Sequence, residues 1–275
     1  MGKDKLRKFR ENETFRCMVQ PSTDQVLNCD HPLKGNWNRD FFGNDNPIVL
    51  ELGCGKGEYT VDLAMRNPSC NYIGVDIKGA RLWKGAGYAE RNGIRNVAFL
   101  RTRIEFICSL FAPGEISEVW ITFADPQIGR EKKRLTSPLF MNRYRSFMKN
   151  GGIVHLKTDS RYLHEYTLAM ARHNNLEILA CATDIYGNDH DRLFDSGLMS
   201  VCGRDAVEAL FEVQTFYEAQ YLAQGIGITY LGFIVDHEGE YESPNWDEDA
   251  WKDENHHFIT PAGAPVKSKF YPEGK

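Results

Sequence analysis

Hydrophobic and polar positions alternate along the chain in blocks that predict strands separated by helices. The apolar run Ile48–Leu52 predicts a buried strand of a parallel sheet, and glycines follow it directly. After the glycines, apolar residues recur at helical spacing, with Tyr59, Leu63 and Ala64 on one face. Strand, glycine turn and helix form the local geometry with which α/β proteins bring backbone close to a bound cofactor.

The same block pattern continues to residue 235. Apolar runs predict six further strands, at 71–75, 97–100, 116–123, 153–157, 176–181 and 226–235. Helical periodicity and capping residues predict helices at 78–92, 103–111, 138–150, 161–173 and 214–224. This order favours an α/β fold with a doubly wound, mostly parallel sheet, whose last strand is antiparallel and lies at an edge.

Composition divides the chain into three parts: a basic arm and irregular lead-in at 1–46, the α/β domain at 47–235, and an acidic tail at 236–275. The first 16 residues carry six Lys/Arg against three Asp/Glu, which fits either a frayed, solvated terminus or an arm that contacts phosphates. In the lead-in, Trp37, Phe41 and Phe42 are expected to pack on the domain. Residues 182–213 are polar and poorly periodic, and we expect a lid or a disordered loop there.

Charge and cysteine content narrow the classes of function. The net charge of the chain is −5, and the tail alone has a charge of −6. The rest of the chain therefore has a net charge of +1, and its clustered basic residues are compatible with binding to nucleic acid. Seven cysteines without a C-x-x-C motif fit free thiols in a reducing, cytoplasmic compartment. No apolar run is long enough to span a membrane, and a signal-peptide stretch is absent from the start, so no membrane partner is expected. No metal site is expected either, because the N-D-H-D run at 188–191 and the pair His256-His257 fit a solvated loop better.

Glycine spacing and two carboxylates discriminate between possible cofactors. Gly53, Gly55 and Gly57 give G-x-G-x-G, whereas dinucleotide-binding turns have G-x-G-x-x-G. Glu51 stands just before the glycines, where its charge would repel a pyrophosphate but suits the cationic S-adenosylmethionine. Asp76 ends the second strand about twenty residues later, at the place of a carboxylate that holds ribose hydroxyls. The pattern favours S-adenosylmethionine, and an ordinary tight turn is the weaker alternative.

Two further carboxylates are predicted at the carboxyl edge of the sheet, where open α/β folds bind ligands. Asp125 follows the strand 116–123, and Pro126 stiffens the exit of the chain. Asp159 follows the strand 153–157 and is either a ligand contact or a plain helix N-cap. Thr215 and Glu218 lie three residues apart, on one face of a predicted helix.

A basic loop, R-E-K-K-R, occupies residues 130–134 directly after Asp125. Clustered like charges beside a ligand site are unfavourable unless they meet an anion. The loop is therefore either a solvated charged loop or a contact for phosphates of a nucleic acid.

Five motifs resemble those of the bacterial, single-subunit TrmB type of tRNA (guanine-N7-)-methyltransferase, over roughly residues 45–235. They are E-L-G-C-G-K-G (51–57), Y-I-G-V-D (72–76), F-A-D-P (123–126) with K-K-R-L (132–135), H-L-K-T-D (155–159) and T-F-Y-E (215–218). The first two are shared by most class I methyltransferases, and the last three are much more specific. The resemblance implies a Rossmann-like class I fold, S-adenosylmethionine as co-substrate, and methylation of a variable-loop guanine of tRNA at N7.

The resemblance also implies roles for individual residues. Asp125 would be the acidic residue at the reaction centre. The cofactor would contact Glu51, Gly53, Gly55, Asp76 and Asp125, and the backbone of Arg103 and Ile104. Guanine would contact Asp159, Thr215 and Glu218, and tRNA phosphates would contact Arg130 and Lys132. The chain departs from the family at Arg103, usually acidic, and at Gln127 and Gly129, usually Trp and Lys; Arg130 or Lys132 is expected to take the place of that lysine.

Guanine N7 carries a free lone pair, so its methylation requires positioning and charge stabilisation rather than a general base. Two other classes of function share the cofactor-binding half. One is a methyltransferase acting on a small molecule, a protein or rRNA, and the other is a non-catalytic module that binds S-adenosylmethionine or RNA. A nicotinamide oxidoreductase is less favoured because of the glycine spacing. The sequence leaves open whether the protein is a monomer or a homodimer.

Overall fold

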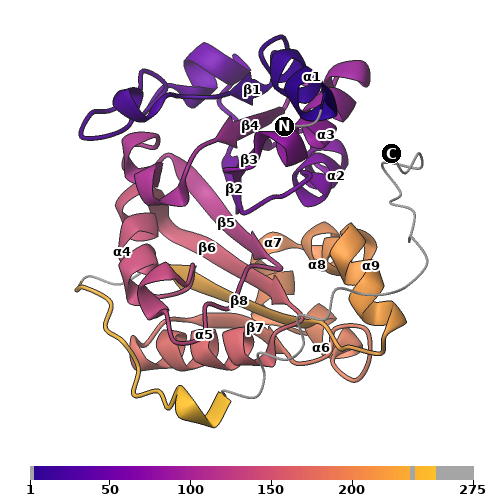
Figure 1. The fold of residues 1–275 in the computed structure, drawn as a ribbon. Coiled ribbons are helices and arrows are strands. Elements are labelled where there is room, and N and C mark those ends of the chain that lie inside the picture. Colours follow the sequence, from indigo (N-terminus) through magenta and orange to yellow (C-terminus); the bar gives the residue numbers. More distant parts are fainter. Residues whose placement is uncertain (1–2, 236–238, 252–275) are drawn as a thin grey trace. The chain divides into compact units, whose positions relative to one another are not determined.

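A computed structural model of the chain, which describes residues 3–235 and 239–251, contains a mixed eight-stranded sheet (Figure 1). The strand order is β1-β4-β3-β2-β5-β6-β8-β7. Helices follow most of the strands along the chain, as the alternation of apolar runs predicts. The predicted doubly wound α/β sheet, mostly parallel with an antiparallel last strand, is therefore confirmed.

The chain divides into two compact units. The first unit contains the described residues up to Trp120 together with Ser146–Lys149, and the second contains Ile121–Arg145 and the described residues from Asn150 onward. These units do not coincide with the three parts predicted from composition, 1–46, 47–235 and 236–275. The three-part division stays a prediction.

The first unit is built on parallel strands. Pairs β1–β4, β4–β3 and β3–β2 are parallel, and Leu50 of β2 lies opposite Ile73 of β3. Every residue of β2 and β3 is buried, which explains why their sequences read as continuous apolar runs. Its strands are β1 (Met18–Val19), β2 (Ile48–Leu52), β3 (Asn71–Asp76), β4 (Val97–Arg101) and most of β5 (Ile116–Thr122). Its helices are α1 (Lys3–Asn12), α2 (Glu58–Arg66) and α3 (Gly79–Arg91), with 3-10 turns at Thr23–Gln25 and Ile104–Ser109.

The N-terminal arm is more ordered than its composition suggests. Residues 3–12 form α1, which packs beside α3 (Figure 1). Trp83 of α3 donates through its indole N–H to Glu11 at 2.6 Å, and Arg7 lies over the Trp83 ring. The interpretation of this arm as a frayed terminus was wrong, because a mainly polar helix can be fixed by a few specific contacts that hydrophobic periodicity does not report.

The lead-in contributes to the core through Trp37, as predicted. A π-helix, Trp37–Phe42, buries this side chain completely, and its indole N–H donates to the Leu110 carbonyl at 2.9 Å. Phe41 and Phe42 are only half-buried beside it.

The second unit ends in antiparallel strands. Strand β6 (Met148–Thr158), which belongs to this unit from Asn150 onward, pairs antiparallel with the last strand β8 (Thr229–Val235). Strand β8 also pairs with β7 (Ile178–Ala182). The antiparallel direction of the last strand was predicted, but its place was not, since β8 is inserted between β6 and β7 and β7 forms the edge. Two helices, α4 (Pro138–Phe147) and α5 (Arg161–His173), belong to this unit or begin in it.

Residues 182–213 are helical rather than a loop. They contain α6 (His190–Phe194), α7 (Gly197–Cys202) and α8 (Arg204–Glu212), followed by α9 (Phe216–Ala223). Each short helix buries only one to three residues, such as Leu193, Leu198 and Leu210. The prediction of a disordered loop was wrong because helices of five to nine residues contain too few turns for a period to be visible, and a role of the segment as a lid stays a prediction.

The first part of the acidic tail packs against α4 and α5. Tyr241 is 4% exposed, and its backbone N–H donates to Asn142 of α4 at 3.0 Å. The next N–H, that of Glu242, donates to Asn174 at 2.8 Å, just past α5. The pair His256-His257 lies outside the described residues. Within the described ranges, no helix is long and apolar enough to cross a membrane.

Candidate active site

The glycine turn after β2 has a backbone path that side chains would block. Gly53, Gly55 and Gly57 all have positive φ, at +75°, +58° and +72°. A Cβ on Gly57 would lie 2.3 Å from the ring of Phe99, whereas a Cβ on Gly53 would meet no atom within 4 Å. Gly53 therefore faces open space, and Gly57 allows the turn to approach β4. This division of roles fits a turn that closes on a ligand at its first two glycines.

Glu51 and Asp76 leave neighbouring strands at the same edge. In the β2–β3 register, Leu52 lies opposite Val75, so both carboxylates stand beside the glycine turn. Glu51 is 4% exposed and accepts hydrogen bonds from the backbone N–H of Thr60, at 2.8 Å, and from its hydroxyl. Asp76 accepts from Gly55 N–H at 3.1 Å and from Lys78 N–H at 2.6 Å. The two acids thus fix the turn and place negative charge around it.

The charges of both carboxylates act on the thiol of Cys54, which lies in the glycine turn. Its side chain is buried, and burial together with the charges of Glu51 and Asp76 raises the pKa of the thiol well above its usual value. A neutral thiol is a poor nucleophile, so this cysteine is kept unreactive beside the turn. Sequence reasoning missed it, although its place between two glycines of the motif was a signal.

Arg103 and Ile104 follow β4. Arg103 is the N-cap residue of the 3-10 helix Ile104–Ser109, and its exposed guanidinium donates to Glu105 at 3.3 Å. Its side chain therefore points into solvent and towards its own loop. A cofactor contact through the backbone of these two residues stays a prediction.

Asp125 lies in the second unit, just after β5, and is exposed. Its carboxylate accepts from Gln127 N–H at 2.9 Å. The flanking residues Phe123 and Gln127 both have left-handed backbone, with φ of +50° and +52°. Non-glycine residues adopt this conformation at a cost, and such outliers concentrate at functional sites.

Asp159 is not the N-cap of α5. Ser160 holds that position, and its hydroxyl accepts from Leu163 N–H at 3.1 Å. Asp159 instead hydrogen-bonds Tyr221 of α9, and burial together with this carboxylate raises the pKa of Tyr221 to about 12. The Tyr221 ring stacks on Phe123 at 6.2 Å. The second unit therefore brings Asp159, α9 and the segment before Asp125 together.

Thr215 and Glu218 are close together but differ in accessibility. Thr215 is the N-cap of α9 and accepts from Glu218 N–H, and the Glu218 side chain accepts from Thr215 N–H in return. The Glu218 carboxylate is fully buried and forms an ion pair with Lys157 of β6 at 2.6 Å. Tyr186 also donates to it, at 2.8 Å. In this state Thr215 is half-exposed, while Glu218 faces the protein interior.

Lys157 was missed by sequence reasoning. It is fully buried at the end of β6 and also donates to the carbonyls of Leu210 and Val213, at 2.7 and 3.1 Å. Burial lowers its pKa, and the Glu218 charge opposes that shift. Its place at the end of a predicted buried strand was the available signal, because a buried cation requires a partner.

The basic loop divides into exposed and buried cations. Arg130, Lys132 and Lys133 are exposed, as a phosphate contact requires. Arg134 is 0% exposed and cannot reach an external phosphate, so its inclusion in the predicted phosphate-binding loop was wrong. The four cations are equivalent in sequence, and only packing distinguishes them.

Comparisons with known proteins agree with these motifs. A family model described as "Putative methyltransferase" matches residues 45–192. The tRNA (guanine-N(7)-)-methyltransferase of Christiangramia forsetii is 50% identical over 236 residues, covering 85% of this chain and 99% of the relative. That of Bacteroides fragilis is 44% identical over 245 residues, covering 89% and 91%. Among solved structures, the 16S rRNA methyltransferase KamB matches with a TM-score of 0.50 and 13% identity, over 70% of this chain and 88% of that one, a likeness of fold alone.

Proposed function

The chain belongs to the tRNA (guanine-N(7)-)-methyltransferase family, and we propose that it transfers the methyl group of S-adenosylmethionine to N7 of a variable-loop guanine in tRNA. The observation that carries the proposal is the 50% identity to a relative of that name over 99% of the relative's length. The coverage matters here, because a match to the cofactor-binding half alone would not distinguish tRNA from other substrates.

The glycine turn and its acids suit S-adenosylmethionine chemically. The cofactor supplies an electrophilic methyl on a cationic sulfonium. Glu51 and Asp76 place two carboxylates at the turn, and Gly53 leaves open space for a ligand to approach the backbone. Asp76 is the acid expected to hold ribose hydroxyls, and the backbone of Arg103 and Ile104 is expected to contact the base.

The second unit supplies the groups for the purine. Asp125 is exposed beside a strained backbone and would stabilise the positive charge that develops on the ring as N7 forms its new bond. Asp159 and Thr215 would accept hydrogen bonds from the edge of the guanine and so align the base. Glu218 is held by Lys157 and Tyr186, so its contact with a base requires that the start of α9 open. No group has to remove a proton from N7.

The exposed cations of the basic loop suit an RNA backbone. Arg130 and Lys132 would contact phosphates and fix the register of the tRNA without reading its sequence. RNA recognition would then depend on the shape of the tRNA and on an accessible base.

The proposal is tested by incubating the protein with unmodified tRNA and methyl-labelled S-adenosylmethionine. Borohydride reduction and aniline cleavage then locate any 7-methylguanine. We expect label in tRNA and cleavage at one variable-loop guanine, with much slower labelling by Asp125→Ala as the control. Label that enters rRNA or protein while tRNA stays unlabelled would contradict the proposed substrate.

A further inference from the structure

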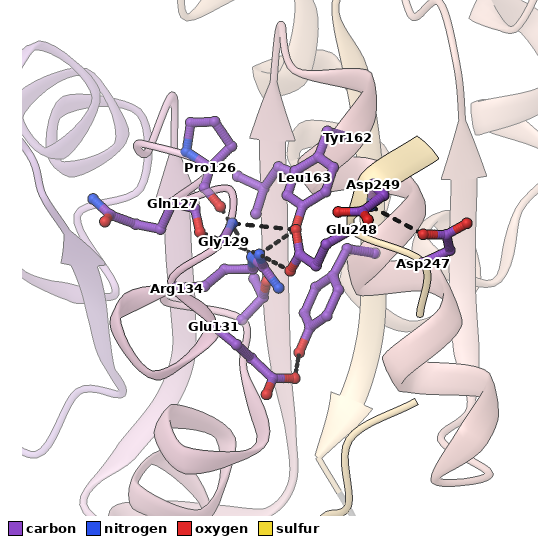
Figure 2. Close-up of polar contacts among 12 residues, drawn as sticks. Pro126, Gln127, Gly129, Glu131, Arg134, Tyr162, Leu163, Asp247, Glu248 and Asp249 are labelled. Carbon is purple, nitrogen blue, oxygen red and sulfur yellow. Dashed lines mark hydrogen bonds and ion pairs between the residues drawn. The ribbon is translucent and has the colours of Figure 1, made fainter. Parts of the chain in front are cut away.

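The C-terminal segment, residues 239–251, reaches into the loop that follows Asp125. Its Glu248 carboxylate accepts from Gly129 N–H at 3.2 Å and from the Arg134 guanidinium at 2.9 Å, and it also accepts from the Tyr162 hydroxyl. Figure 2 shows this carboxylate between the loop and α5. One side chain of the acidic tail therefore joins two points of the loop that are five residues apart.

Arg134 is the other half of this junction. Its Nε donates to the Pro126 carbonyl at 2.9 Å, and its Nη2 donates to the Gln127 carbonyl at 3.2 Å (Figure 2). Its guanidinium lies over the rings of Tyr162 and Tyr166, at 4.8 and 3.9 Å. The arginine thus holds both carbonyls of the strained stretch next to Asp125 from inside the protein.

The buried cation needs a counter-charge, and Glu248 is the carboxylate that forms an ion pair with it among the described residues. Partial burial opposes ionisation of Glu248, but the hydrogen bonds from Tyr162, Arg134 and Gly129 outweigh it and lower its pKa. The carboxylate is therefore charged at neutral pH. Without it, the guanidinium would stay buried without its ion-pair partner.

The C-terminal segment is anchored, so Glu248 is held in place. Trp246 packs edge-on against Tyr162 and Tyr166, at 5.8 and 5.6 Å, and stacks with Trp251 at 5.7 Å. Backbone bonds to Asn142 and Asn174 fix its beginning. These contacts hold a largely exposed segment against α4 and α5.

We propose that Glu248 is a positioning residue for tRNA binding: through Gly129 and Arg134 it fixes loop 125–134, so that Asp125 and the exposed cations Arg130, Lys132 and Lys133 face the RNA. The assignment rests on the proposed function. It gives the acidic C-terminal segment a part in binding an anionic substrate, by a charge that is used internally and is therefore not available to repel phosphate.

The test compares two full-length variants, Glu248→Gln and Glu240→Gln. Both lose one carboxylate from the same segment, but Glu240 is exposed, and no contact of its side chain is described. For Glu248→Gln we expect the KM for tRNA to rise about tenfold, the effect of one lost charge-assisted hydrogen bond. The affinity for S-adenosylmethionine is expected to stay unchanged, and Glu240→Gln is expected to match the wild type in both measurements.

Limited trypsin digestion gives a second readout that does not depend on activity. Arg130, Lys132 and Lys133 are cleavage sites within the loop, and they are protected as long as the loop is fixed. We expect faster cleavage in the loop for Glu248→Gln at a temperature where both variants are folded.

Two results would overturn the proposal. One is a Glu248→Gln protein with the KM and the loop cleavage of Glu240→Gln. The other is a parallel loss of thermal stability, kcat and cofactor affinity with an unchanged KM for tRNA, which would indicate a general structural role. If the wild type transfers no methyl to tRNA, the proposed function fails, while the cleavage comparison still decides whether Glu248 fixes the loop.

Discussion

Glu51 and Asp125 are carboxylates at the ends of strands, but their surroundings differ. Glu51 is buried and bonded to Thr60, whereas Asp125 is exposed and bonded only to the nearby Gln127 among the hydrogen bonds described for it. The first is part of a preformed turn, and the second is an exposed group on the loop that follows β5. Their replacement should therefore affect different steps.

We expect Asp125→Ala to lower kcat about a hundredfold, the usual effect of losing one group that stabilises developing charge. Its affinity for S-adenosylmethionine should fall less than that of Glu51→Ala, which removes a carboxylate from the turn itself. Calorimetric titration of the cofactor and single-turnover kinetics measure the two effects. Equal losses of cofactor affinity in both variants would contradict these roles.

His164 gives a pH dependence of stability. It is 1% exposed on α5, its Nε2 lies 3.6 Å from the Cys181 Sγ, and burial lowers its pKa from 6.5 to about 4. Above pH 6.5 the histidine is neutral in both states and has no effect. As the pH falls from 6.5 to 4, only the unfolded state takes up the proton, so the native state loses up to roughly 3 kcal/mol.

Urea unfolding at pH 7 and pH 4.5 measures this loss. We expect His164→Gln to lose less stability than the wild type between the two pH values, because glutamine does not titrate. An equal loss in the two proteins would show that other groups cause the acid sensitivity.

At the scale of elements, the basic loop contains three exposed cations and one buried cation. Its exposed lysines are free to meet phosphates, while Arg134 holds the loop from inside through Pro126 and Gln127. The same type of side chain is thus exposed and available to an external anion in one position and holds protein structure in another.

We expect the double variant Lys132→Gln/Lys133→Gln to bind tRNA more weakly and with a smaller salt dependence. The slope of log affinity against log salt concentration should become shallower by about 0.9 for each lost phosphate contact. Its thermal stability should match that of the wild type. Arg134→Gln should instead lower the thermal stability, because it leaves the carboxylate of Glu248 without its cation. Filter binding across a salt series and thermal melts separate the two cases, and an unchanged salt slope in the lysine variant would remove these residues from the interface.

At the scale of the whole molecule, the net charge of −5 is a poor guide to the partner. The acidic tail supplies the excess, and in its described part Glu248 is used to neutralise a buried arginine. Net charge therefore does not exclude an anionic partner, because exposed charges more than about 10 Å apart are largely screened from one another and local patches matter more.

Cofactor binding should stabilise the whole protein by mass action. At about one hundred times its Kd, S-adenosylmethionine should raise the free energy of unfolding by about 2.7 kcal/mol. Scanning calorimetry with and without the cofactor measures this, and Glu51→Ala at the same concentration should show a smaller gain. An absence of any shift in the wild type would contradict the cofactor assignment.

The sequence by itself determined the strands of the parallel part and the glycine turn. Ile48–Leu52 and Asn71–Asp76 could be recognised because burial on both faces requires apolar residues throughout. The glycines and the two acids of the turn are local in sequence, so their spacing carried the information. The same local motifs were sufficient to identify the family.

Only the tertiary structure decided the features that depend on distant partners. Helices α6, α7 and α8 are too short to show a period, and the position of β8 between β6 and β7 depends on pairing across the sheet. Arg134 resembles a surface cation in sequence, and the partner of Lys157 cannot be read from its strand. Both are buried because Glu248 and Glu218 supply their counter-charges from 114 and 61 positions further along the chain. Local patterns specify secondary structure and turns, whereas the protonation, burial and partner of a charged side chain are set by whichever residues the fold brings next to it.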